Sequence, residues 1–251
     1  MTAFRKSLRT RRRAQQGFTL VELSIAVLIG LFLLGGLLTI VQDMRRTFGA
    51  QNGLAQLQDN ERLAMTLIAD VIQAAGFYPD PTTQTATSSF PLVGLLAVGQ
   101  SIVGTRNAAA PGDSISVRYL TAPNDGVINC RGGSNITGAP VLYTNTFSVT
   151  ALNNGQLQCT LGGVGVFPLV TGITNMQILY GIRRNPASPS NNVDTFVNAA
   201  QMAAADWPNV ICVKVTLTFT NPLFATQPQQ PPTIKFTRVV TVMNRAGVNT
   251  T

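Results

Sequence analysis

The chain has 251 residues and a hydrophobic content of 45%, enough for one sizeable core with an appended segment. Its net charge of +8 is concentrated near the start: six basic and no acidic residues precede residue 17, and the remainder carries 12 basic and 10 acidic residues. This distribution argues against a general nucleic-acid-binding surface. With no His and only three Cys, the chain lacks Ser-His-Asp triads, Cys-His pairs and the usual zinc ligand sets, so we expect no enzyme activity, metal or cofactor.

Residues 18–41 form an apolar run that is long enough to span a membrane. As a helix its 24 residues would reach roughly 36 Å, against about 30 Å for the hydrocarbon core of a bilayer. A cleaved secretory signal would have a shorter apolar region, of about 7 to 15 residues, followed by a site of small residues. Because most of the nearby positive charges precede the run, we expect the N-terminus to stay in the cytoplasm and the rest of the chain to cross.

One acidic residue, Glu22, interrupts this run. An acid at the centre of a membrane helix costs about 2.5 to 3.5 kcal/mol, and less near an end. In one interpretation, Glu22 reaches the membrane interface from its place near the start of the run. In the other, which we favour, a cut between Gly17 and Phe18 makes Phe18 the new N-terminus, and its amine lies one helical turn from the carboxylate. Glu22 then pairs with this amine or with that of a neighbouring copy, and sets the register of assembly.

Residues 42–76 continue the helical pattern without a proline, with apolar residues at spacings of three, four and seven. Gly76 and the YPDP that follows it predict the end of the helix. We therefore expect one helix over roughly residues 18–75, apolar on all sides in its first half and on one side in its second. Gly35 and Gly36 lie in the first half, where they permit either close packing between membrane helices or a bend.

Residues 77–110 are rich in Pro, Thr, Ser and Gly and predict a long excursion with one strand or helical turn. Beyond it the hydrophobic pattern has a period of two, which is typical of strands. The alternating runs are 113–120, 145–152, 156–161, 176–182, 210–219 and 234–243. Asn153 to Gly155 predicts a hairpin turn, and the last two runs are expected to pair. The predicted fold is α+β: residues 77–251 form a head with an antiparallel sheet of five or six strands, packed on the second half of the helix.

The stretch RRRAQQGFTLVEL, residues 11–23, resembles the class III signal of type IV pilins and pseudopilins. The resemblance implies that a prepilin peptidase removes the basic leader, residues 1–17, by cutting after Gly17. It further implies that Phe18 becomes the N-methylated terminus and that Glu22 guides assembly.

The same resemblance implies that residues 18–41 anchor the chain in the bacterial inner membrane, with the head in the periplasm and later on the pilus at the cell surface. Many major pilins carry a proline at the twenty-second mature position, where this chain has Thr39. The unwinding that such a proline promotes is therefore not implied for this chain.

The head resembles that of PilW-type minor pilins, in spaced blocks such as TNTFSV, NMQILYGI and WPNVICVKVTL. The resemblance implies a subunit without catalytic chemistry that helps initiate pilus assembly, lies at or near the tip, and supports twitching motility, adhesion or DNA uptake. Its implied partners are the prepilin peptidase, other minor pilins, the major pilin and the inner-membrane assembly platform, with a tip adhesin as a further candidate. The alternatives are a GspJ-like minor pseudopilin of a type II secretion system, a DNA-uptake receptor and an anchored enzyme.

Three cysteines allow three choices of a single disulfide bond, and the spacing alone leaves these open. Cys212 lies in an alternating strand, which favours a buried free thiol. The resemblance to PilW-type pilins implies a bond between Cys130 and Cys159. Two arginine-containing stretches, RGG at 131–133 and GIRRN at 181–185, could contact DNA, but arginines at a strand end are more often simply solvated.

Overall fold

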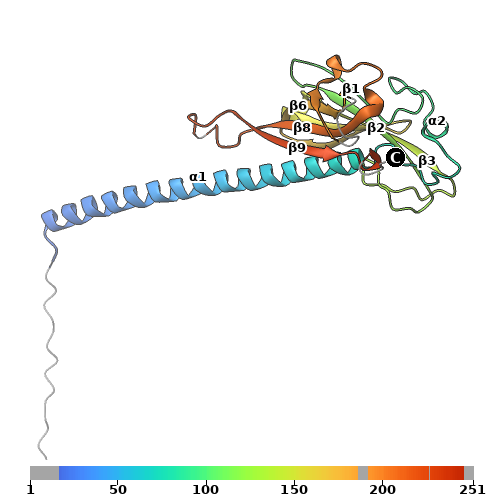
Figure 1. Ribbon diagram of the computed structural model, residues 1–251. Coiled ribbons are helices and arrows are strands. Elements are labelled where there is room, and N and C mark those ends of the chain that lie inside the picture. Colours follow the sequence, from blue (N-terminus) through green and yellow to red (C-terminus); the bar gives the residue numbers. More distant parts are fainter. Residues whose placement is uncertain (1–16, 186–191, 226, 246–251) are drawn as a thin grey trace, which may run out of the picture. The chain divides into compact units, whose positions relative to one another are not determined.

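The computed structural model describes residues 17–185, 192–225 and 227–245. The basic leader therefore lies outside the described residues, apart from Gly17. Contacts divide the chain into two units, Met1–Gly49 and Ala50–Thr251. The first unit contains the N-terminal part of the helix α1, and the second contains the rest of α1 and every described strand (Figure 1).

Helix α1 extends over Leu20–Gln73 and continues without a break through Gly35 and Gly36. Bending or local unwinding at these glycines in a filament stays a prediction. In the first unit its large apolar side chains are exposed, as expected for a segment that is apolar on all sides. In the second unit one face is buried; its members are Leu57, Ala64, Met65, Ile68, Ala69, Val71 and Ile72. The two halves predicted from the sequence thus differ in burial as expected.

The helix ends where the sequence predicts. Gly76 adopts a φ of 75°, a left-handed conformation that glycine adopts with little strain. Its amide donates a hydrogen bond to the carbonyl oxygen of Arg118 (3.0 Å), and its own carbonyl oxygen accepts one from the side chain of Asn244 (2.8 Å). These bonds attach the end of the helix to both the first half and the C-terminal part of the head.

The strands form two antiparallel sheets in place of the single sheet expected. The first sheet has its strands in chain order, β1 (Ile102–Thr105), β2 (Ser114–Thr121), β3 (Val141–Thr150), β4 (Gln156–Leu161) and β5 (Gly165–Thr171). The second has the order β7 (Thr195–Val197), β6 (Ile173–Ile182), β8 (Val210–Thr220) and β9 (Thr233–Thr241). The short helices are α2 (Ala86–Ser89), η1 (Leu152–Asn154), η2 (Ala199–Gln201), η3 (Trp207–Asn209) and η4 (Met243–Arg245).

Each of the six alternating runs overlaps a strand. Residues 77–110, where one strand or helical turn was expected, contain both α2 and β1, whereas β5 and β7 were not predicted. Strand β7 has only three residues, and β5 contains Pro168, a residue found at sheet edges because it has no amide hydrogen. Both predicted pairings are confirmed. Strands β3 and β4 form a hairpin through Asn153 and Asn154, which have φ of 53° and 62°. Strand β9 pairs with β8 along the whole length of β9.

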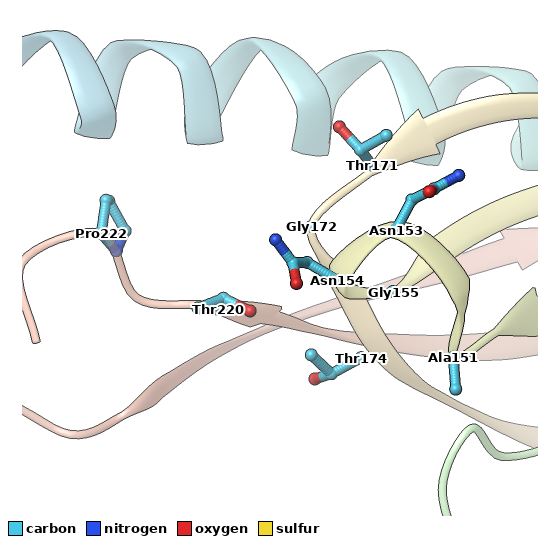
Figure 2. Close-up of a pocket in the computed structure, with 9 residues that line it drawn as sticks. All are labelled: Ala151, Asn153, Asn154, Gly155, Thr171, Gly172, Thr174, Thr220 and Pro222. Carbon is cyan, nitrogen blue, oxygen red and sulfur yellow. The ribbon is translucent and has the colours of Figure 1, made fainter. Parts of the chain in front are cut away.

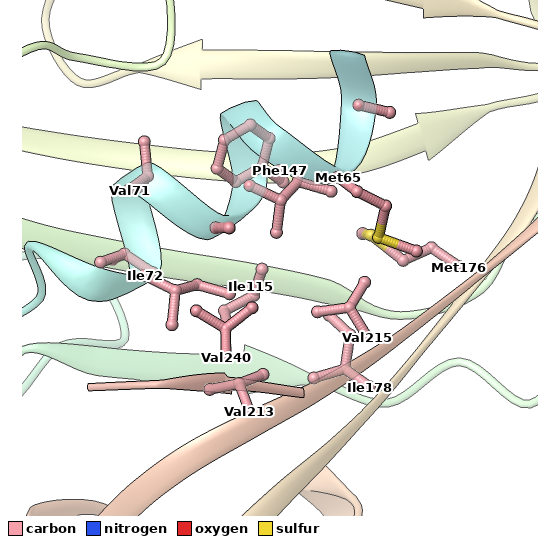
Figure 3. Close-up of a cluster of buried hydrophobic side chains, with 14 of the residues drawn as sticks. Met65, Val71, Ile72, Ile115, Phe147, Met176, Ile178, Val213, Val215 and Val240 are labelled. Atoms are coloured by element: carbon pink, nitrogen blue, oxygen red, sulfur yellow. The ribbon is translucent and has the colours of Figure 1, made fainter. Parts of the chain in front are cut away.

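The buried face of α1 packs on side chains from both sheets (Figure 3). Met65, Val71 and Ile72 of the helix lie among core residues of the first sheet, such as Ile115 and Phe147, and of the second; the latter include Met176, Ile178, Val213, Val215 and Val240. A single helical face therefore closes one core shared by the two sheets.

Candidate processing and assembly site

The junction between Gly17 and Phe18 precedes the helix. Residues 17–19 have no regular secondary structure, and the side chain of Phe18 is 85% exposed. A β-carbon at Gly17 would meet no atom within 4 Å. The peptide bond is therefore exposed and outside the hydrogen-bonded helix, which is the condition a peptidase needs to reach it.

Glu22 lies in the first turn of α1 and is linked to Thr19. The hydroxyl of Thr19 accepts a hydrogen bond from the amide of Glu22 (3.3 Å) and donates one, at 3.5 Å, to its carboxylate. Thr19 thus caps the helix, and the carboxylate lies near the positive end of the helix dipole. Thr19 was missed in the sequence, although the pattern T-x-x-E at the start of an apolar run is a recognised N-cap signal.

Exposed apolar side chains surround Glu22, including Val21, Leu23 and Ile25. In the described part of the chain, no basic side chain forms an ion pair with it. A carboxylate in such surroundings needs a cation once the helix enters lipid or packs against other apolar helices. A terminal amine at Phe18, which would exist only after cleavage, would lie four residues away.

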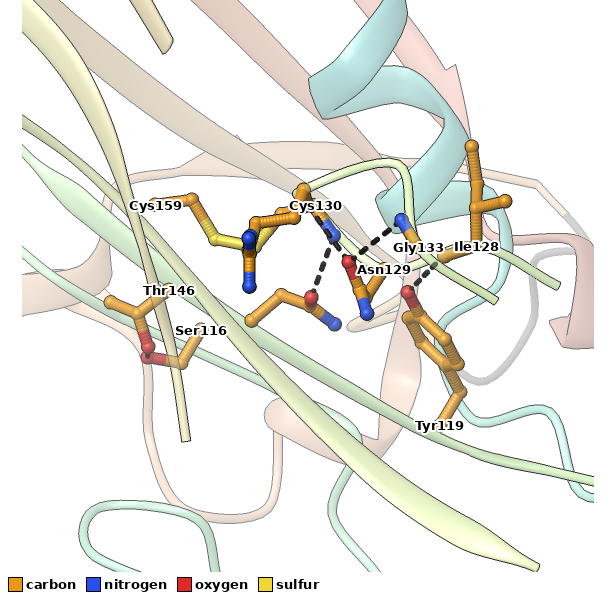
Figure 4. The surroundings of a disulfide bond; sticks show 10 residues. Ser116, Tyr119, Ile128, Asn129, Cys130, Gly133, Thr146 and Cys159 are labelled. Atoms are coloured by element: carbon orange, nitrogen blue, oxygen red, sulfur yellow. Dashed lines mark hydrogen bonds between the residues drawn. A yellow bond between two sulfur atoms is a disulfide. The ribbon is translucent and has the colours of Figure 1, made fainter. Parts of the chain in front are cut away.

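The head is crosslinked by a disulfide bond between Cys130 and Cys159 (Figure 4). The two α-carbons are 6.2 Å apart, and the bond joins the loop before β3 to the strand β4 across 29 positions. Cys159 faces the core and is fully buried. Of the three pairings that the spacing permits, this is the one implied by the resemblance to PilW-type pilins.

Hydrogen bonds hold the loop that carries Cys130. The Cys130 amide donates to the side chain of buried Asn145 (2.9 Å), and the side chain of Asn129 accepts from the amides of Arg131 (2.9 Å) and Gly133 (3.2 Å; Figure 4). Because these bonds supply partners for backbone amides that leave the sheet, the loop has a fixed conformation around the disulfide.

Cys212 is the remaining cysteine and is a buried free thiol, as the alternating pattern predicts. It lies on β8, and a β-carbon at Gly181 of the neighbouring strand would lie only 2.5 Å from its sulfur, which is closer than van der Waals contact allows. Burial raises the pKa of this thiol. A buried thiol with a raised pKa is poorly reactive, so we assign Cys212 to packing.

An open pocket of about 750 Å³ lies where the β3–β4, β5–β6 and β8–β9 connections meet (Figure 2). Its lining is Ala151, Asn153, Asn154, Gly155, Thr171, Gly172, Thr174, Thr220 and Pro222. None of these nine side chains ionises, so none of them can act as a general acid or general base near neutral pH. Among the described residues there is likewise no group of three His, Cys, Asp or Glu side chains that could hold a metal ion.

The two arginine-containing stretches make contacts within the head. The guanidinium of Arg131 lies 4.2 Å from the centre of the Phe167 ring, in cation–π geometry. Arg184 forms an ion pair with Asp206 at 2.7 Å and donates to the carbonyl oxygen of Gln201 at 2.8 Å. The hydrogen bond from Arg184 lowers the pKa of Asp206. These contacts give both arginines a structural role and provide no support for a DNA-binding site.

A helix that is long and apolar enough to cross a membrane, beginning at an exposed Gly-Phe junction and ending in the core of a β-rich head, is the architecture of type IV pilins and pseudopilins. The family model for the prokaryotic N-terminal methylation motif matches residues 12–38. A second model, for the type IV pilus-assembly protein W, matches residues 134–246 in the head. Each match covers less than half of the chain, and together they show that its N-terminal segment and its head are similar to these two families. A comparison with curated proteins finds no match.

Proposed function

We propose that this chain is a minor pilin that helps initiate assembly of a type IV pilus and lies at or near its tip. The observation that carries the proposal is the position of Glu22. It is the single acid in the exposed apolar run 18–41, lies close to an accessible Gly17–Phe18 junction and has no ion-pair partner among the described residues. Such an acid is unfavourable in an isolated membrane helix and becomes favourable when a cation is brought to it.

In the proposed sequence of events, prepilin peptidase cuts after Gly17, and the new amine of Phe18 is methylated. The positively charged amine then pairs with Glu22 of its own chain or of a neighbour. In a low dielectric, a subunit that enters the filament in register gains this charge pair, whereas a subunit out of register leaves both charges unpaired. The carboxylate therefore selects one axial position for the incoming helix.

The remaining parts of the proposal concern location and partners. Before assembly the helix holds the chain in the inner membrane, with the N-terminus in the cytoplasm and the head in the periplasm. The proposed partners are prepilin peptidase, other minor pilins, the major pilin, the assembly platform and a tip adhesin. The uncharged lining of the pocket in Figure 2 supports a structural rather than a catalytic role.

A GspJ-like minor pseudopilin of a type II secretion system is the second candidate, because the N-terminal methylation motif is common to both systems. Deleting the gene separates them. Loss of surface pili and of twitching motility supports the pilus assignment, and loss of exoprotein secretion with normal pili supports the pseudopilin.

Terminal sequencing of the native protein tests the processing step: we expect N-methylated phenylalanine at position 18, and an intact basic leader would contradict it.

A further inference from the structure

A smaller pocket, of about 210 Å³, lies on the face of the second sheet that is turned away from the core. Strands β6 and β8 supply most of its lining. Ile178 and Val215 on these strands are buried in the core, so the side chains that alternate with them point to the opposite face. The polar side chains that line this β6–β8 pocket are Arg106, Gln177, Asn198, Lys214 and Thr216. None of them lines the pocket in Figure 2.

The β6–β8 pocket is lined by two cationic side chains and, among the described residues, by no acid. Arg106 follows β1, and its guanidinium forms an ion pair at 2.9 Å with the buried carboxylate of Asp113. The other oxygen of this carboxylate accepts a hydrogen bond from the amide of Ile178 at 2.8 Å. Asp113 therefore neutralises and orients Arg106, and the positive charge of Lys214 is left in excess.

Lys214 is half-buried and has no partner within the described part of the chain. It lies opposite Leu179 in the pairing of β6 with β8, where no acid forms an ion pair with it and no group accepts a hydrogen bond from its ammonium. Lysine side chains usually extend into water so that the charge stays solvated. Lys235 on the neighbouring strand β9 is exposed in this way. A half-buried ammonium group in an acid-free pocket gains more from a bound anion than an exposed one.

Amide side chains add neutral hydrogen-bonding groups to the lining. The side-chain oxygen of Asn198 accepts from the amide of Ala200 at 3.0 Å, and its amino group has no acceptor among the described residues. Gln177 lies opposite Thr216 in the strand pairing, and its side chain reaches the same pocket. Ammonium and amide groups donate hydrogen bonds, and a carboxylate or phosphate accepts several of them. The pocket therefore combines a surplus positive charge with unused donors.

We propose that the β6–β8 pocket binds a small organic oxyanion, a molecule with one carboxylate or phosphate group. The oxyanion pairs with Lys214, and the amides of Asn198 and Gln177 bind hydroxyl groups on the same molecule. A volume of about 210 Å³ is below the roughly 300 to 1,000 Å³ of pockets for drug-sized ligands, so the expected ligand has the size of a single sugar acid or sugar phosphate. This binding goes beyond the proposed role in assembly and does not depend on it.

The test is titration calorimetry of the processed full-length chain in a nonionic detergent without sugar groups. The probes are glucuronate, which supplies a carboxylate, glucose 6-phosphate, which supplies a phosphate, and glucose, which supplies neither. We expect at least one of the two anions to bind about tenfold or more tightly than glucose. Binding of glucuronate alone assigns a carboxylate ligand, and binding of glucose 6-phosphate alone assigns a phosphate ligand.

Variants of two lysines locate the site. Lys214→Met removes the charge but keeps an unbranched side chain, and it should weaken binding of the anion about tenfold or more, whereas Lys214→Arg keeps the charge and should retain binding. The matched control is Lys235→Met, which removes a lysine charge from the adjacent strand and should leave binding unchanged. Circular dichroism of each variant verifies that the head is folded.

Four results would each overturn the inference. The first is no binding of either anion at concentrations up to about 10 mM, and the second is glucose binding as tightly as the anions. The third is unchanged binding in a folded Lys214→Met chain. The fourth is an equal loss in Lys235→Met, which would show attraction to the net charge of the head and not to a pocket. Pilus formation after gene deletion tests the proposed function separately, because the calorimetry requires no assembled filament.

Discussion

The rings of Tyr180 and Trp207 lie edge to face, with their centres 5.0 Å apart, and the hydroxyl of Tyr180 has no hydrogen-bond partner among the described residues. Tyr180 is fully buried, and a β-carbon at Gly104 would collide with its hydroxyl. The equally buried Tyr119 differs, because its hydroxyl donates to the carbonyl oxygen of Ile128 at 2.6 Å. The head therefore contains one satisfied and one unsatisfied buried phenol.

These two tyrosines should respond in opposite directions to the same substitution. Tyr180→Phe removes an unpaired polar group and is expected to raise the free energy of unfolding by about 1 kcal/mol. Tyr119→Phe removes a hydrogen bond and leaves the Ile128 carbonyl without it, so stability is expected to fall by about 1 kcal/mol. Denaturant unfolding of the full chain in detergent measures both. A loss of stability in Tyr180→Phe would mean that its hydroxyl has a partner.

The same residues predict sensitivity to alkaline pH. Burial raises the pKa of Tyr119 and Tyr180 above the ordinary value of 10.0. Since the folded state keeps both phenols protonated while the unfolded state loses their protons, their contribution to stability is complete below about pH 10 and declines as the pH rises above it. Tyrosinate absorbance from these two residues should appear only together with unfolding measured by circular dichroism. Their ionisation in a folded head would contradict the prediction.

Replacing Glu22 tests the charge pair in assembly. Glu22→Ala should still insert into the membrane, because the apolar run becomes more hydrophobic, but its incorporation into surface filaments should fall by about tenfold or more. Quantitative immunoblots of sheared pili and of membranes measure the two pools. The matched control is Glu61→Ala, which removes an acid from the part of the same helix beyond the apolar run. Unchanged incorporation of Glu22→Ala would refute the assigned role.

The disulfide bond should contribute strongly to the stability of the head. Its closed loop spans 29 positions, for which the chain-entropy model gives about 3 to 4 kcal/mol. Cys130→Ser in the full chain should lower the free energy of unfolding by about this amount. Cys212→Ala is the control and should have a smaller effect, because it removes one buried thiol and no crosslink. Mass mapping of non-reduced fragments that joined Cys159 to Cys212 would show a different pairing in cells.

Local pattern was enough to position the predicted elements and to pair β3 with β4 and β8 with β9, but it did not show how the strands divide between two sheets. The alternation around Ile178 and Val215 locates two strands, but a period of two is the same whichever neighbour pairs with them. The break between β5 and β6 depends on a turn at Gly172, where φ is 84°, followed by pairing of β6 with β8. For that reason one sheet was expected and two are present.

Local sequence was sufficient to predict the membrane-length helix, the single acid of its apolar run and the end of the helix shortly before Gly76, because length, charge and glycine content act over a few neighbouring residues. The division into two sheets and the burial of Arg118 against carbonyl groups of residues 90–100 follow from the three-dimensional packing alone. The carbonyl groups that bind this guanidinium belong to residues 18 to 28 positions away in the chain, and no local pattern encodes a contact that forms only when the head closes.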